Sequence, residues 1–131
     1  MANEISLEWV EGLRFEGRAG TAKVAIDGDG EAGTSPVNLL LESVGACAAA
    51  DVVDILEKGR QELRAMTVDV RADRQEDAPR YVKRLYMTFR IDGDVDPSKA
   101  RRAVDLSLEK YCSVFHSLRM DLNVETEIEL G

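Results

Sequence analysis

The sequence has no surplus of positive charge and no run of lysine and arginine. It carries 17 lysine and arginine residues against 25 aspartate and glutamate residues, which gives a formal net charge of −8. Negative surface charge repels the phosphate backbone of nucleic acids and the headgroups of anionic membranes. We therefore expect neither nucleic acid nor a membrane surface to be a partner of this protein.

Long apolar segments are also missing. No stretch reaches the roughly 20 apolar residues that cross a bilayer, and the longest, residues 39–50, contains Glu42 and many alanines. The first residues do not combine a charged segment with an apolar core, as a secretory signal peptide does. These features predict a cytoplasmic protein.

Cysteine and histidine are scarce: the chain has Cys47, Cys112 and His116. Two cysteines in a cytosolic chain are more often reduced or catalytic than a structural bridge. The two thiols and the imidazole would supply three metal ligands, whereas a structural zinc site needs four. The run Asp-Gly-Asp-Gly at residues 27–30 lacks downstream calcium ligands and is interpreted as a turn. We therefore expect no bound metal.

The chain is of a size that suits one domain, which we place at residues 1–131. Its 131 residues fit the usual domain range, and 44% of them are hydrophobic, enough to bury a small core. The sequence contains no internal repeat, linker or low-complexity segment.

Hydrophobic periodicity predicts six strands and two main helices. Alternation of apolar and polar residues indicates strands over residues 4–9, 14–18, 22–26, 63–74, 81–92 and 122–130. Ser35-Pro36 and Asp96-Pro97 place a capping residue before a proline and predict helices over about 35–58 and 96–111, with a further short helix over 114–119. The order βββ-α-ββ-α-β favours an antiparallel α+β domain.

The middle of the first predicted helix, residues 43–50, contains only small or slim side chains. Gly45 costs about 1 kcal/mol relative to alanine inside a helix. We expect that this cost is offset because a residue without a side chain lets another helix approach closely.

Two segments resemble the signatures of a known family. Residues 35–47 read Ser-Pro-x-x-Leu-Leu-Leu-x-x-x-Gly-x-Cys, and residues 51–56 read Asp-Val-Val-Asp-Ile-Leu. The second segment, residues 103–114, contains the second cysteine. The first segment resembles the OsmC/Ohr family, and the second is similar to its YhfA-like branch. The similarity covers nearly the whole chain from residue 35 onward.

The resemblance implies an OsmC-like fold, an intertwined homodimer in which antiparallel sheets from both chains pack on two long central helices. It also implies thiol-dependent reduction of organic hydroperoxides in oxidative-stress defence. Cys47 would be the peroxidatic thiol and Cys112 the resolving thiol, without a cofactor. A dithiol such as a dihydrolipoyl protein would regenerate the pair.

Peroxidases of this family also use a glutamate and an arginine near the thiol. The glutamate follows the proline of the helix start, where this sequence has Val37; Glu42 is a candidate replacement. Arg14 and Arg18 are candidates for the arginine. A further carboxylate, three residues before the second cysteine, is Glu109, which could orient that thiol or be an ordinary exposed helix residue.

The charges near Cys47 disfavour a thiolate. Cys47 lies in mid-helix, away from the amides of a helix N-terminus, and Asp51 and Asp54 follow on the same side of the helix. Nearby carboxylates and burial raise a thiol pKa. A cation must offset them, and Lys58 is a candidate besides the two arginines.

Two other functions remain open at this point. The chain could keep the fold without the peroxidase site and bind a small apolar ligand at the dimer interface, or it could be a stress-related interaction protein. Cys47 would then be a small buried hydrophobe.

Overall fold

The computed structural model describes residues 2–131, which form two compact units divided after Leu40. The first unit contains three strands and the start of the first helix, and the second contains the remaining strands and most of the helical residues. Within the described residues, no helix is both long enough and apolar enough to cross a membrane.

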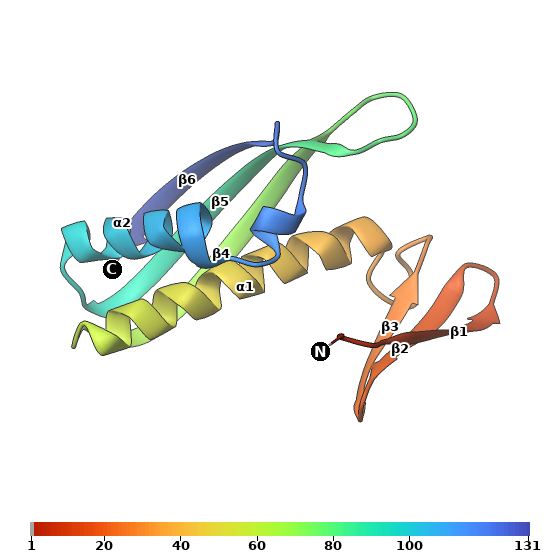
Figure 1. Ribbon diagram of the computed structural model, residues 1–131, viewed down its shortest axis with the longest axis horizontal. Coiled ribbons are helices and arrows are strands. Elements are labelled where there is room, and N and C mark those ends of the chain that lie inside the picture. Colours follow the sequence, from red (N-terminus) through yellow and green to blue (C-terminus); the bar gives the residue numbers. More distant parts are fainter. Residues whose placement is uncertain (1) are drawn as a thin grey trace. The chain divides into compact units, whose positions relative to one another are not determined.

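The first unit is an antiparallel meander of β1 (Ser6–Glu11), β2 (Arg14–Ala19) and β3 (Ala22–Asp27) (Figure 1). This confirms the three strands predicted from alternation. In the register, Trp9 lies opposite Phe15 and Leu7 lies opposite Gly17. Apolar residues of the three strands therefore share one face of the sheet, because side chains opposite one another point to the same side.

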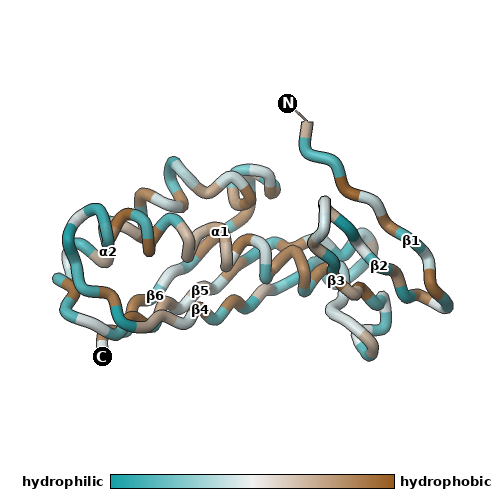
Figure 2. The backbone as a smooth tube through the Cα atoms, turned by 90° about the horizontal axis from the view of Figure 1, so that it is seen from below, coloured by the Kyte–Doolittle hydropathy of each residue, from teal (hydrophilic) through white to brown (hydrophobic). Residues whose placement is uncertain are grey.

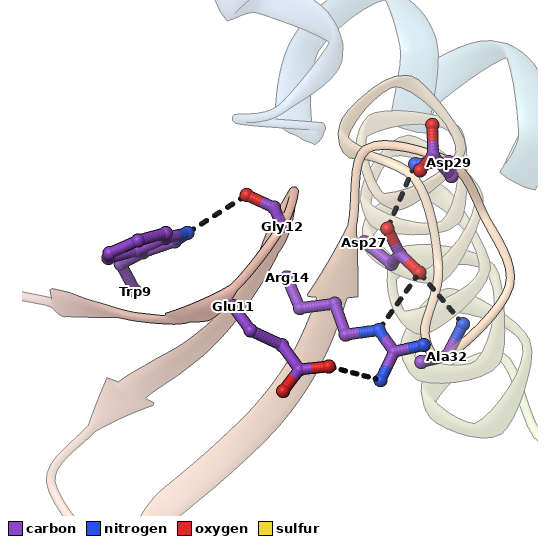
Figure 3. A network of polar contacts seen from close by, with 7 residues as sticks. All are labelled: Trp9, Glu11, Gly12, Arg14, Asp27, Asp29 and Ala32. Atoms are coloured by element: carbon purple, nitrogen blue, oxygen red, sulfur yellow. Dashed lines mark hydrogen bonds and ion pairs between the residues drawn. The ribbon is translucent and has the colours of Figure 1, made fainter.

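The loop after β3 is organised by the buried carboxylate of Asp27 (Figure 3). It accepts hydrogen bonds from the backbone N–H groups of Asp29 and Ala32, both at 2.9 Å, and pairs with Arg14 at 3.7 Å. These N–H groups, chiefly that of Ala32, lower the pKa of Asp27. The segment forms a turn, as the glycines predicted.

The second unit contains one long helix and one three-stranded sheet. Helix α1 (Pro36–Lys58) begins where the sequence predicted, and the Ser35 hydroxyl accepts a hydrogen bond from the Asn38 N–H at 3.2 Å. The other elements follow in the order β4 (Glu62–Arg74), β5 (Val82–Asp94), α2 (Pro97–Leu106), the π-helical turn η1 (Ser107–Tyr111), the 3₁₀ turn η2 (Phe115–Ser117) and β6 (Asn123–Leu130).

The expectation of a wholly antiparallel fold is wrong for the last strand. β4 and β5 are antiparallel, but β6 runs parallel to β5, with Leu85 opposite Val124 and Phe89 opposite Ile128. The helical crossover between β5 and β6 makes this possible, since a parallel connection needs about a dozen residues. Alternating hydrophobicity places side chains on a face but does not encode the direction of a strand.

The core of the second unit lies between its helices and one face of its sheet. Figure 2 shows apolar and polar residues alternating along these strands, and apolar residues of strands and helices together form the buried set. Its largest fully buried side chains are Phe89, Leu56, Leu85, Met87, Ile91, Val44, Val52, Val104 and Cys112.

Gly45 has a different neighbour from the one we expected. A Cβ atom at this position would lie 3.0 Å from the Val70 side chain of β4. Within this chain, the small residue therefore lets α1 approach a strand rather than a second helix.

Candidate functional site

The two cysteines both belong to the second unit and contribute to the same core. Cys47 lies in the middle of α1 and is half-buried, whereas Cys112 follows η1 and is completely buried. Both are free thiols, and Cys47 packs against the buried cluster that includes Cys112. One thiol is therefore accessible in part, while the other is enclosed.

The surroundings of Cys112 favour its protonated form. Burial raises the pKa of this thiol to about 11, and the nearby Cys47 and Asp51 also raise it. The Phe115 N–H donates a hydrogen bond to the Cys112 sulfur at 3.4 Å and opposes the shift. Cys112 is thus a neutral thiol at physiological pH, since its pKa lies well above that range.

A wide helical turn places Cys112 in the core. Helix α2 starts at Asp96, whose carboxylate accepts a hydrogen bond from the Ser98 N–H at 2.9 Å. It ends at Leu106, and the chain continues as η1. Directly after η1, the Cys112 N–H donates a hydrogen bond to the Ser107 carbonyl oxygen at 2.7 Å. The helix predicted to reach residue 111 therefore changes type five residues earlier. Such π turns frequently occur at functional sites.

Ser107 connects η1 to α1. Its hydroxyl is fully buried and lies 2.9 Å from a carboxylate oxygen of Asp51 and 3.3 Å from the Ala48 carbonyl oxygen. Ser107 was not singled out from the sequence. A hydroxyl among otherwise apolar positions was the signal that could have identified it, because a buried hydroxyl needs a partner.

The cations considered as thiolate supports each pair with a carboxylate. In the first unit, Arg14 contacts Glu11 at 3.5 Å besides Asp27, and Arg18 contacts Glu16 at 2.6 Å. In the second unit, Lys58 donates to Asp54 at 2.9 Å, and this bond raises the lysine pKa.

The remaining candidates lie at the surface. Glu42 is exposed on α1, and Glu109 is exposed on η1. His116 is exposed too, with its ring edge-on to Phe115 at 5.8 Å between centroids. No group of three or more histidine, cysteine, aspartate or glutamate side chains within residues 2–131 is arranged to hold a metal.

A surface cavity of about 360 Å³ adjoins the same part of α1. It is lined by Asp51, Asp54, Ile55, Lys58 and Tyr111. Asp51 therefore faces this cavity and also contacts the buried Ser107.

The thiol pair can support two-step redox chemistry. A partly accessible thiol can be oxidised to a sulfenic acid, and a second thiol nearby can condense with it to form a disulfide. The asymmetry in burial suits Cys47 to the first role and Cys112 to the second.

Comparison with known proteins identifies the family to which the chain is similar. The family model described as OsmC-like protein matches residues 28–127. Protein YhfA of Escherichia coli K12 is 39% identical over 127 residues, covering 95% of each chain.

Two solved structures show the same fold. A hypothetical protein from Aquifex aeolicus has a TM-score of 0.93 at 29% identity, covering 100% of this chain and 97% of that chain. An organic hydroperoxide resistance protein from Legionella pneumophila has a TM-score of 0.72 at 15% identity, covering 98% and 97%. The family match spans most of the sequence and includes both cysteine-bearing segments. The chain belongs to the OsmC-like protein family.

Proposed function

We propose that the protein is a thiol-dependent peroxidase that reduces organic hydroperoxides through Cys47 and Cys112. The observation that carries this proposal is the pairing of a half-buried thiol with a buried one whose pKa is raised to about 11. Such a pair assigns attack on the peroxide to Cys47 and resolution to Cys112. The name of the structurally similar Legionella protein supports the choice of substrate class.

The proposed reaction needs no cofactor, because the two thiols supply the electrons that reduce the peroxide. The Cys47 thiolate attacks the terminal peroxide oxygen, the O–O bond breaks, and the alkoxide takes a proton and leaves as an alcohol. Cys112 then attacks the sulfur of the Cys47 sulfenic acid, the S–O bond breaks, and the hydroxide leaves as water with the Cys112 proton. A dithiol, for which a dihydrolipoyl protein is our candidate, reduces the disulfide by exchange and is itself oxidised.

A second copy of the chain completes the proposed enzyme. In the first unit, Leu7, Trp9 and Phe15 are 58%, 65% and 38% exposed on the apolar face of the sheet. A small sheet with one uncovered apolar face needs a partner to be stable. We propose an intertwined homodimer in which residues 1–131 act as one domain, with Arg14 or Arg18 supporting the thiolate.

A second candidate function is binding of a small apolar ligand at the dimer interface without catalysis. Two observations favour it: Val37 stands where peroxidases of the family have glutamate, and the first unit has an apolar groove of about 260 Å³. The groove is lined by Ile5, Leu7, Gly17, Arg18, Ala19, Ala22, Lys23, Val24, Ile26 and Leu39.

The deciding experiment treats the reduced protein with one equivalent of cumene hydroperoxide and maps its thiols by mass spectrometry. We expect a Cys47–Cys112 disulfide in the parent, a persistent Cys47 sulfenic acid in Cys112→Ser, and no oxidation in Cys47→Ser. Persistence of both parent thiols would reject the peroxidase and leave ligand binding or an interaction role.

A further inference from the structure

A series of contacts connects the helix that carries Cys47 to the segment that carries Cys112. Asp51 follows Cys47 by one turn of α1, and its carboxylate lies 2.9 Å from the Ser107 hydroxyl. The carbonyl oxygen of Ser107 accepts the Cys112 N–H at 2.7 Å. Cys47 and Cys112 are thus connected through Asp51 and Ser107, from one helix to the other.

We propose that Asp51 and Ser107 are positioning residues for the thiol pair, which hold the segment carrying Cys112 against the helix carrying Cys47. The inference rests on the proposed thiol chemistry for its purpose. Ser107 links the two segments, because its side chain contacts α1 while its carbonyl oxygen accepts the hydrogen bond from the Cys112 backbone. Asp51 supplies both an acceptor for this hydroxyl and a negative charge beside the pair.

Burial makes the Asp51–Ser107 hydrogen bond effective. The Ser107 hydroxyl has no access to solvent, and a buried hydroxyl that loses its partner is strongly penalised. Its second neighbour, the Ala48 carbonyl oxygen, is farther away at 3.3 Å. The carboxylate is therefore the main acceptor, and the π turn is held in one place.

Burial is the main reason that Cys112 stays protonated, and the charge of Asp51 adds to its effect. The groups that act on the Cys112 thiol are Cys47 and Asp51 from α1 and the Phe115 amide from its own segment. The carboxylate favours the neutral thiol at Cys112, whereas the amide favours the thiolate. Asp51 thus helps to keep Cys112 protonated until Cys47 has been oxidised, when the departing hydroxide takes the proton.

Asp51→Asn tests the charge while keeping the shape and an oxygen acceptor for Ser107. In a Cys47→Ser background, the ionisation of Cys112 is followed by carbon NMR of labelled cysteine, which does not require access to the thiol. We expect the ratio of thiolate to thiol, read about one pH unit below the midpoint of the parent, to rise about twofold, since a negative charge near the thiol is lost. Asp54→Asn is the matched control, because it removes the same charge from an exposed position on the same helix.

Ser107→Ala tests the connection while keeping the charge. The parent, Asp51→Asn and Ser107→Ala proteins are equilibrated with dithiothreitol, and the effective concentration of one thiol at the other is obtained from the disulfide fraction. We expect Ser107→Ala to lower this effective concentration at least about threefold, because the turn that carries Cys112 gains conformational freedom. The effective concentration in Asp51→Asn should stay close to that of the parent. Circular dichroism checks that each variant is folded.

The outcomes separate this inference from the peroxidase proposal. Equal ionisation of Cys112 in the Asp51→Asn and Asp54→Asn variants would remove the role of the Asp51 charge. An unchanged effective concentration in a folded Ser107→Ala protein would remove the positioning role. If both shifts occur but hydroperoxide never oxidises the pair, the positioning is supported and the peroxidase fails.

Discussion

The two units of the chain bury apolar surface in opposite ways. Among the described residues of the first unit only Gly17 and Asp27 are buried, whereas the second unit encloses a continuous cluster around Phe89. The first unit has an amphipathic sheet whose apolar side remains exposed, and the second has both a core and the thiol pair. The second unit therefore packs within itself, whereas the first unit presents an apolar surface on which something else can pack.

The largest effect is expected from a charge on the exposed apolar face of the first unit. We expect Trp9→Asp to abolish the proposed dimer and to lower stability by more than about 3 kcal/mol, because a buried, unpaired charge in an interface is costly. Sedimentation and chemical unfolding measure the two effects.

Glu8→Gln is the matched control for this change, since Glu8 points to the opposite face of the same strand. It should leave both sedimentation and unfolding unchanged. A Trp9→Asp protein that sediments as the parent does would place the interface elsewhere.

The core of the second unit gives the next largest effect. Phe89 is completely buried between helices and sheet, so Phe89→Ala should lower the free energy of unfolding by about 3–5 kcal/mol. Glu127→Ala, at an exposed position of the neighbouring strand, serves as control and should change it by less than about 0.5 kcal/mol. Similar losses in the two variants, measured by urea denaturation, would contradict the assignment of the core.

A smaller, pH-dependent effect is expected at Asp27. Hydrogen bonds from backbone N–H groups lower its pKa in the folded protein below the ordinary 3.8. A lowered folded pKa stabilises the protein above the unfolded value, and this contribution disappears as the pH falls through the folded value. Asp27→Asn should therefore lower the melting temperature at neutral pH, and the difference should shrink below about pH 4.

Asp29→Asn is the comparison for Asp27, because the Asp29 side chain is exposed and only its backbone N–H enters the network. We expect a small effect without the same pH dependence. A loss at Asp27 that persisted unchanged into acid would mean that shape rather than charge organises the loop.

The smallest effect concerns the start of α2. Asp96→Ala removes the capping carboxylate and should lower the melting temperature by a few degrees, because a helix-end N–H loses its acceptor. Ser98→Ala keeps that backbone contact but removes the hydroxyl that also donates to Asp96 at 2.8 Å. It should be milder, and the reverse order in a thermal melt would contradict the capping role.

Local sequence signals predicted most elements of the fold. Ser35-Pro36 and Asp96-Pro97 located both helix starts, and alternation located the six strands. These features depend on neighbouring residues and are visible in a single chain. The parallel pairing of β5 with β6 was not predicted, because it depends on where the crossover returns the strand.

The candidate site was predictable only in part. Each cysteine stood in a recognisable motif, and the structure places both in one core. Ser107 was missed because its partner Asp51 is 56 positions away, a separation that no periodicity reveals. Arg14 and Arg18 remain predictions as thiolate supports, since each contacts carboxylates of its own unit.

The positions of the two cysteines along the chain have a consequence for turnover of the protein in the cell. A Cys47–Cys112 disulfide would enclose β4, β5 and α2 in one covalent loop. Closing a loop of about 65 residues lowers the conformational entropy of the unfolded chain, which stabilises the folded state by about 4 kcal/mol. The oxidised protein would then expose cleavable segments to proteases less often than the reduced protein. Oxidation of the thiol pair would thereby lengthen the lifetime of the protein.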